Sequence, residues 1–200
     1  MYRNAVDRDI NEIVDIHLES FQGFFMSLLG PKFLELYYRM VLEYPGRIFI
    51  VKESEGRIVG FVSGFLNPAL FYKQIRHVRL EWLLKILPYI LVHPWLIPRL
   101  VASYAQTIKT IKTSEIGVCE LSSIAVNPRM LRGGVGKGLI EVFLNHVKGR
   151  ANSVMLTTDA LGNDNVNRFY NNLGFQLEET LERSKGRKLN KYKLMINNTN

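Results

Sequence analysis

Residues 127–140 read NPRMLRGGVGKGLI and follow the strand-like run ELSSIAV at residues 120–126. Four glycines lie close together in this stretch: Gly133, Gly134, Gly136 and Gly138. Apolar residues at helical spacing come next: Leu139, Ile140, Phe143, Leu144 and Val147. A strand, a glycine loop and a helix N-terminus in this order aim backbone N–H groups at phosphate oxygens. The stretch therefore predicts that the protein binds a phosphorylated cofactor.

Two common phosphate-binding loops do not fit this spacing. The P-loop requires G-x-x-x-x-G-K-[ST], but Leu131 stands at its first glycine and Gly138 at its hydroxyl position. Without that hydroxyl there is no ligand for magnesium, which argues against a nucleotide triphosphatase. The dinucleotide pattern G-x-G-x-x-G fails because Leu139 stands where its last glycine is required.

A third pattern fits better. Residues 126–140 resemble motif A of the GNAT superfamily of N-acetyltransferases, whose core reads V-x-P-x-x-[QR]-x-x-G-x-G/A. The matching residues are Val126, Pro128, Gly134 and Gly136. Leu131 departs from the family's Gln/Arg position, and Arg132 follows one residue later. In the family this position contributes mainly its backbone amide. Taken alone, the stretch fits a glycine-rich turn without a ligand about as well.

A second motif strengthens the resemblance. Residues 163–175 read NDNVNRFYNNLGF, and the family carries N-x-x-[AV]-x-x-[FL]-Y-x-x-x-G-F after its fifth strand. Six positions match in order and spacing: Asn163, Val166, Phe169, Tyr170, Gly174 and Phe175. Two motifs in the family's order, separated by one helix and one strand, rarely arise by chance. The resemblance covers residues 1–66 and 115–196.

The resemblance implies an α/β (α+β) fold. We expect a mixed, mostly antiparallel central sheet of about seven strands flanked by helices, with a helical insertion between strands 3 and 4. One acetyltransferase domain would span residues 1–196, followed by a tail at 197–200. Hydrophobic periodicity and turn residues predict strands at 2–6, 47–53, 57–65, 120–126, 153–158, 175–181 and 189–196, and helices after Asp9 and at 31–43 and 135–148. Asp9 and Glu12 have the spacing of a capping box for the first of these helices.

Residues 67–114 form the insertion, in which we expect two helices at about 71–91 and 94–112. Charged residues and prolines interrupt its apolar runs, so it does not read as a transmembrane segment. One interpretation is a helical layer that packs on the sheet or on a second subunit, as in a homodimer. The other is a lid or interfacial surface that receives an acceptor with an apolar group near a membrane.

Composition narrows the function classes. Hydrophobic residues make up 47% of the 200 residues, which is typical of a globular chain. The only cysteine, Cys119, excludes an intramolecular disulfide and argues against a metal cluster; we expect it in the core of a strand. The net charge of +8 is compatible with nucleic acid, an anionic membrane or an anionic small molecule. No nucleic-acid-binding motif accompanies it. The polar start of the chain predicts a cytoplasmic location.

The resemblance also implies acetyl-coenzyme A as the acyl donor and direct attack of a primary amine on its thioester. Backbone amides of the glycine loop would hold the pyrophosphate: Leu131, Arg132, Gly133, Gly134, Val135, Gly136 and Lys137. The fourth strand would align the pantetheine arm and offer an N–H to the oxyanion through Ile124, Ala125 and Val126. Asn163 would either order the loop after the fifth strand or contact the cofactor arm.

Tyr170 occupies the family's tyrosine position and is the candidate general acid, since a phenol stays protonated at neutral pH. Glu120 on the fourth strand is the candidate general base, and alternation places it on one face with Ser122 and Ile124. The alternatives are an exposed strand-end carboxylate at this position and a base that acts through water. Asp159 is a weaker candidate for the acceptor site. His17 reads as a satisfied histidine at the edge of the core.

The sequence says less about the amine acceptor than about the acyl donor. Residues 23–34 followed by the second motif look like family members associated with bacterial surface polysaccharides, which implies an amino sugar, nucleotide- or lipid-linked. The rival acceptors are a protein N-terminus, a lysine or a polyamine, and the basic charge places polyamines last. A non-catalytic coenzyme A-binding module, with residues 67–114 as its docking surface, is the alternative from a different class.

Overall fold

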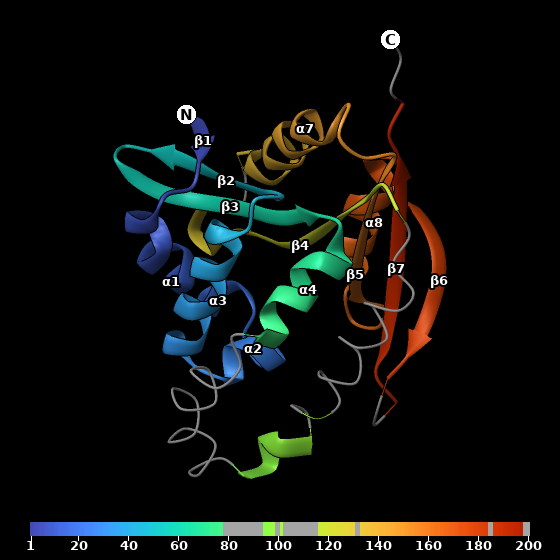
Figure 1. Ribbon diagram of the computed structural model, residues 1–200, viewed down its shortest axis with the longest axis horizontal. Helices are drawn as coiled ribbons and strands as arrows, with labels where there is room; N and C mark the ends of the chain where they lie inside the picture. The colour runs from blue at the N-terminus through green and yellow to red at the C-terminus, as the bar shows by residue number, and fades with distance from the viewer. Residues whose placement is uncertain (78–93, 99–100, 102–115, 131–132, 184–185, 198–200) are drawn as a thin grey trace.

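The computed structural model describes residues 1–77, 94–98, 101, 116–130, 133–183 and 186–197. It contains one seven-stranded sheet in the order β1-β2-β3-β4-β5-β7-β6 (Figure 1). The strands are β1 (Tyr2–Asn4), β2 (Arg47–Ser54), β3 (Arg57–Leu66), β4 (Val118–Val126), β5 (Ser153–Asp159), β6 (Gln176–Glu182) and β7 (Lys188–Met195). Neighbouring strands are antiparallel except β4 and β5, which are parallel. The predicted seven-stranded, mostly antiparallel sheet is confirmed.

Helices cover both faces of this sheet. They are η1 (Asp7–Asp9), α1 (Ile10–Ser20), α2 (Phe25–Leu28), α3 (Pro31–Glu43), α4 (Pro68–His77), η2 (Pro94–Leu96), η3 (Pro128–Met130), α7 (Val135–Val147) and α8 (Asp164–Asn172). Figure 1 shows α1, α3 and α4 on one face and α7 on the other. The sheet is therefore the middle layer, with a buried apolar cluster on each side.

Local sequence accounts for several of these elements. Glu55 and Gly56 both have positive φ, at 52° and 74°, as a two-residue turn between antiparallel strands requires. The β2–β3 hairpin is therefore where the sequence predicted it. Helix α3 begins at Pro31, and proline is favoured in the first turn because its fixed φ suits a helix.

The predicted capping box on the first helix is wrong. The Asp9 carboxylate accepts the backbone N–H of Val6 at 2.9 Å and two guanidinium bonds from Arg3 at 2.6 and 2.9 Å. Glu12 accepts the backbone N–H of Ile58 at 2.9 Å. Both carboxylates are thus engaged with the sheet, because charge-assisted bonds to Arg3 outweigh a cap on α1.

The described part of the insertion begins with α4, three residues earlier than predicted. Asn67 precedes it with a positive φ of 52° and donates its backbone N–H to the Val118 carbonyl at 3.1 Å. The insertion is thereby tied to the first residue of β4. The remainder of the helices predicted at 71–91 and 94–112 lies outside the described residues, apart from η2 and a few residues beside it. Among the helices that the structure describes, none is long and apolar enough to cross a membrane.

Candidate active site

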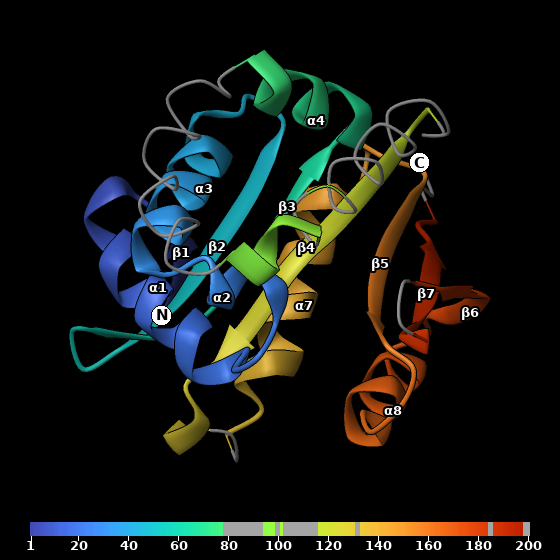
Figure 2. The same cartoon turned by 90° about the horizontal axis from the view of Figure 1, so that it is seen from below.

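Strands β4 and β5 are paired only over their first three residues and then part. Only three residue pairs join them, and the last is Glu120 with Met155. Figure 2 shows the strands together at the paired end and diverging toward their carboxyl ends. We call this region the fork: residues 121–126 of β4 and 156–159 of β5. The facing backbone groups of these residues are not paired with each other, so they remain available to hydrogen-bond an extended ligand.

The glycine loop sits at the end of β4 and leads into α7. Gly134 adopts a left-handed conformation (φ 67°, ψ 10°) immediately before the helix. The first bond within α7 runs from the Gly138 N–H to the Gly134 carbonyl at 3.0 Å. The N–H groups of Val135, Gly136 and Lys137 precede it in the first turn, where helical N–H groups have no intrahelical acceptor. Leu131 and Arg132, also predicted to bind the cofactor, lie outside the described residues.

The two sequence motifs meet at this helix end. A side chain at Gly136 would lie 3.7 Å from the Phe169 ring and 3.8 Å from Val126, so α8 and β4 both approach α7 there. Gly138 serves packing, because a Cβ at that position would lie 2.0 Å from the Tyr2 hydroxyl. Lys137 is exposed and forms an ion pair with Glu141 at 3.8 Å, which leaves its backbone N–H as its contribution to the loop.

Tyr170 is buried on α8, in the same cluster as Leu121 of β4 and Leu156 of β5. Those two residues directly follow the last paired positions of β4 and β5, so the cluster that holds Tyr170 also includes the base of the fork. Its ring packs against Phe175 and Tyr192 at centroid distances of 5.6 and 6.0 Å. Burial raises the pKa of the Tyr170 phenol well above its usual range, which keeps it protonated at neutral pH.

Asn163 orders the loop after β5. Its Nδ2 donates to Thr158 Oγ1 at 2.8 Å and to the Asp159 carbonyl at 3.3 Å. Asn167, one turn later, is a residue that the sequence did not single out. Its Nδ2 donates to the carbonyls of Asp159 and Asn163, and its Oδ1 accepts from Asn190 and from the Tyr192 hydroxyl at 3.0 Å each. Three of these four bonds hold α8 against β5 and β7, and the fourth, to Asn163, is local to the start of α8.

A β-bulge in β4 changes the predicted facing of its side chains. Ser63 pairs with Ser123 and Gly64 with Leu121, so Ser122 is the extra residue. A bulge of this kind reverses the alternation beyond it. Ser122 shares a hydrogen bond with Tyr37 of α3 at 2.6 Å, whereas Ile124 packs against the cluster around α7. The prediction that Glu120, Ser122 and Ile124 share one face is therefore wrong for Ile124.

Glu120 is half-buried on the α4 side of β4, and its Oε1 accepts the Tyr72 hydroxyl at 2.7 Å. Removal from water raises the pKa of the carboxyl to about 7, although the bond from Tyr72 opposes this rise. A group with such a pKa can take up and release a proton near neutral pH. The alternative of a freely exposed strand-end carboxylate is wrong.

Two contacts connect the carboxyl ends of the fork through the last residue of α1 and the segment that joins α1 to α2. Ser20 donates its hydroxyl to the carbonyl of Val126, the last residue of β4, at 3.4 Å. Arg187 lies over the Phe24 ring at 5.5 Å and donates to both carboxylate oxygens of Asp159, the last residue of β5, at 2.7 and 3.1 Å. Asp159 thus has a structural partner, and three distant segments meet at this end.

Two other predicted residues are buried in the core. Cys119 is fully buried, and desolvation raises the pKa of its thiol to about 12; this matches the prediction of a core residue. His17 is 3% exposed, and burial lowers its pKa to about 4. Its Nδ1 shares a hydrogen bond with the Tyr38 hydroxyl at 2.6 Å, whereas its Nε2 has no partner among the described residues. The histidine is thus only half satisfied.

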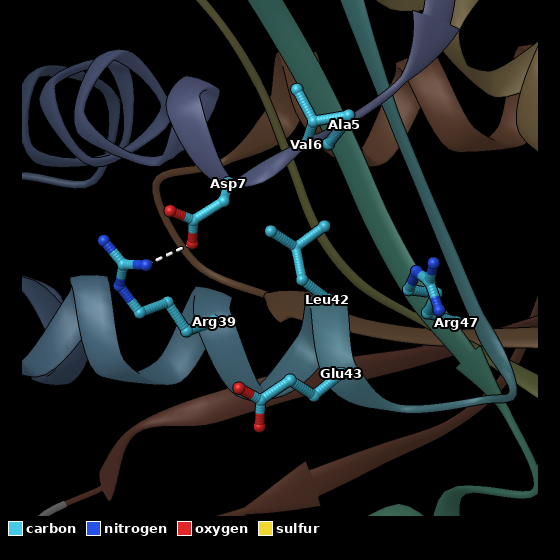
Figure 3. Close-up of a pocket in the computed structure, with 7 residues that line it drawn as sticks. All are labelled: Ala5, Val6, Asp7, Arg39, Leu42, Glu43 and Arg47. Atoms are coloured by element: carbon cyan, nitrogen blue, oxygen red, sulfur yellow. Dashed lines mark hydrogen bonds and ion pairs between the residues drawn. The ribbon is translucent and has the colours of Figure 1, made fainter.

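The surface hollow in Figure 3 lies elsewhere. It is lined by residues from the end of β1 to η1, from α3 and from the start of β2: Ala5, Val6, Asp7, Arg39, Leu42, Glu43 and Arg47. An ion pair between Asp7 and Arg39 crosses it. None of its residues comes from β4, β5, α7 or α8, so it is separate from the fork.

Sequence reasoning missed Tyr72, Phe24 and Arg187. Tyr72 and Arg187 lie outside the two motifs, and their partners Glu120 and Asp159 are 48 and 28 residues away. The aromatic pair at residues 24 and 25 was visible within the stretch compared with polysaccharide enzymes, but nothing local indicated its contact with Arg187. Such partners follow from topology, since they depend on which elements the sheet brings together.

Comparison with known proteins places this arrangement among acetyltransferases. Residues 10–175 match the family model of the acetyltransferase (GNAT) family. No curated protein matches the chain significantly.

Solved structures share the fold at low identity. The ribosomal-protein-alanine N-acetyltransferase of Brucella melitensis is 15% identical with a TM-score of 0.64, over 98% of this chain and 99% of that one. The ribosomal-protein-S18-alanine N-acetyltransferase of Escherichia coli is 12% identical with a TM-score of 0.61, over 98% and 93%. An N-acetyltransferase of Staphylococcus aureus is 16% identical with a TM-score of 0.61, over 98% of both chains.

Proposed function

The chain belongs to the acetyltransferase (GNAT) family of acyltransferases, and on that premise we propose that it transfers an acetyl group from acetyl-coenzyme A to a primary amine. The observation that carries the proposal is the fork. The β4–β5 ladder ends at Glu120 and Met155, and Gly133 and Gly134 lie between the end of β4 and the start of α7. Tyr170 lies in the apolar cluster that includes the first unpaired residues of both strands. An extended donor with a phosphate end suits diverging strands next to a helix N-terminus.

The residues of the loop fit such a donor. A Cβ at Gly134 would have no atom of the described residues within 4 Å, so these residues leave space beside the first turn of α7. Backbone N–H groups of Gly133, Gly134, Val135, Gly136 and Lys137 would hold the pyrophosphate, joined by those of Leu131 and Arg132. Ile124, Ala125 and Val126 would align the pantetheine arm. The donor supplies an acetyl group activated as a thioester.

Two side chains would move the protons. Glu120, with a pKa of about 7, would accept a proton from the attacking amine, directly or through a water. Tyr170 would donate its phenolic proton to the departing sulfur as the carbon–sulfur bond breaks, because burial keeps this phenol protonated. A main-chain N–H of β4 near Ile124 would stabilise the negative charge that develops on the carbonyl oxygen.

Thermal unfolding with acetyl-coenzyme A, coenzyme A and ATP–magnesium in parallel tests the cofactor. A ligand at 100 times its Kd stabilises the folded state by about 2.7 kcal/mol, which raises Tm by several degrees in a domain of this size. We expect a rise with both coenzyme A species and none with ATP–magnesium. A rise with ATP–magnesium alone would contradict the proposal and indicate that the loop binds another ligand.

For the acceptor we propose an amino sugar, nucleotide- or lipid-linked. The support is the likeness of residues 23–34 and of the second motif to enzymes of bacterial surface-polysaccharide synthesis, together with the position of Phe24 beside the fork. A protein N-terminus is the rival, because two structures of similar fold are named ribosomal-protein N-acetyltransferases. Acetylation assays on 4-amino-4,6-dideoxy sugar nucleotides and on a peptide panel separate the two. Turnover on peptides alone would exclude the amino sugar.

A further inference from the structure

We propose that Tyr72, contributed by helix α4 of the insertion, is a positioning residue that holds the Glu120 carboxylate in one orientation and favours its ionised form. The proposal rests on the proposed function, in which Glu120 accepts the proton of the amine. Its geometric basis is the hydrogen bond from the Tyr72 hydroxyl to Glu120 Oε1 at 2.7 Å, between residues 48 positions apart.

The position of Tyr72 is fixed by its surroundings. Helix α4 is anchored to β4 because the Asn67 N–H donates to the Val118 carbonyl at 3.1 Å. The neighbouring Phe71 stacks on Phe65 of β3 at a centroid distance of 3.8 Å, and Tyr72 meets the same Phe65 edge-on at 5.7 Å. A ring held in this way loses little conformational entropy when its hydroxyl binds Glu120, so the hydrogen bond is preorganised.

The other groups near Glu120 do not replace Tyr72. From α3, the Tyr37 hydroxyl is bonded to Ser122 at 2.6 Å, and the adjacent Cys119 thiol stays neutral at physiological pH. The residues paired with Glu120 on β3 and β5 are Phe65 and Met155, which do not titrate. No ion pair of Glu120 occurs within the described ranges.

The direction of the effect follows from these contacts. Burial raises the pKa of Glu120 to about 7, and the hydrogen bond from Tyr72 lowers it because it stabilises the carboxylate. Removing that donor leaves burial unopposed, so the pKa of Glu120 must rise further. Glu120 would then be protonated, and unable to act as a base, over a wider pH range around neutrality.

Tyr72→Phe tests this inference because it keeps the ring and removes only the hydroxyl. We expect the acidic limb of the kcat/KM profile to move to higher pH, with unchanged affinity for acetyl-coenzyme A. Tyr44→Phe is the matched control. Tyr44 stands in the same aromatic cluster, but its hydroxyl donates to the Leu66 carbonyl at 2.8 Å, so its removal should leave the limb in place. An unmoved limb in Tyr72→Phe would overturn the proposal.

A direct measurement separates this inference from the proposed function. In protein labelled with ¹³C at glutamate δ-carbons, Glu120→Gln assigns the Glu120 resonance, and its pH titration is followed in wild type and in Tyr72→Phe. A higher titration midpoint of Glu120 in Tyr72→Phe than in wild type supports the inference. Full activity of Glu120→Gln would refute only the role of Glu120 as the base and would leave this inference standing. An equal or lower midpoint overturns the inference even if Glu120→Gln is inactive.

Discussion

At the residue scale, burial has opposite consequences for Tyr170 and Glu120. Removal from water raises the pKa of both groups because it disfavours their charged forms. For Tyr170 this keeps the proton in place, so the phenol can donate. For Glu120 it brings the pKa to about 7, so the carboxyl can accept a proton under ordinary cellular conditions. In the proposed mechanism, one physical effect thus prepares an acid on α8 and a base on β4.

Tyr170→Phe should lower kcat by about 10²- to 10⁴-fold, the usual contribution of a positioned general acid, and leave the Kd for coenzyme A nearly unchanged. Steady-state kinetics and calorimetric titration measure the two quantities. Tyr192→Phe is the control, because its ring lies 6.0 Å from that of Tyr170 but its hydroxyl is bonded to Asn167. Equal losses of kcat in Tyr170→Phe and Tyr192→Phe would show that altered packing explains the effect and that proton transfer by Tyr170 does not.

Glu120→Gln should be inactive yet more stable than wild type at pH 8. The folded-state pKa of Glu120, about 7, lies above its ordinary value of 4.5. Between these values the folded state binds the proton more tightly, so wild type loses stability as pH rises through this window. The amide side chain of the variant does not titrate and therefore escapes that loss. The difference in Tm between variant and wild type should grow from pH 5 to pH 8; a constant difference would contradict a raised pKa.

At the element scale, the junction of the glycine loop and α7 can be tested separately from helix stability. Gly134 and Gly149 flank α7, with φ values of 67° and 72°, and within the part of the chain that the structure describes a Cβ at either would meet no atom within 4 Å. Alanine at each position should therefore cost a similar ~1–2 kcal/mol of backbone strain. We expect Gly134→Ala to weaken coenzyme A binding and Gly149→Ala to leave it unchanged, as measured by titration. Equal affinities in the two variants would argue against a phosphate site at this loop.

Elements with local signals could be predicted from the sequence. Pro31 fixed the start of α3, and Glu55–Gly56 fixed the β2–β3 turn, because both signals act through the backbone of neighbouring residues. The first motif placed Gly134 directly before α7 and the second placed Tyr170 on α8, whereas their roles in cofactor binding and catalysis stay predictions. The bulge at Ser122 carried no such signal, since it arises from pairing with Ser63 and Gly64, which lie far earlier in the chain.

Side-chain partners were harder to predict for the same reason. Asp9 and Glu12 had the local spacing of a cap, but Arg3 and the Ile58 N–H offered them stronger or better-placed donors in the folded chain. Tyr72 and Arg187 became visible as site residues only once the sheet had brought α4 to Glu120 and the β6–β7 hairpin to Asp159. Side chains such as Asp9 and Glu12 can bind either local or distant groups, so their partners in the folded chain could not be predicted from local sequence.

At the scale of the whole molecule, three segments distant in sequence close the open end of the fork. Ser20 at the end of α1 contacts the end of β4, Phe24 in the following segment contacts Arg187, and Arg187 binds Asp159 at the end of β5. The segment leads into α2, which packs on α3, and α3 lies on the face of the sheet opposite α7 (Figure 1). Weakening this three-segment contact should therefore weaken binding of the acceptor more than binding of the cofactor.

Arg187→Ala should raise the KM for the acceptor several-fold and leave the Kd for coenzyme A within about twofold. The change in Tm should be small, because an ion pair this exposed contributes at most about 1 kcal/mol. Lys191→Ala removes the same charge from the same hairpin, but Lys191 binds Glu178 at 2.7 Å and lies outside the three-segment contact. If both variants raised KM equally, loss of positive charge would explain the effect. If only Arg187→Ala does so, and Arg187→Lys gives an intermediate value because it keeps the charge without the bidentate geometry, the contact that closes the fork shapes acceptor binding.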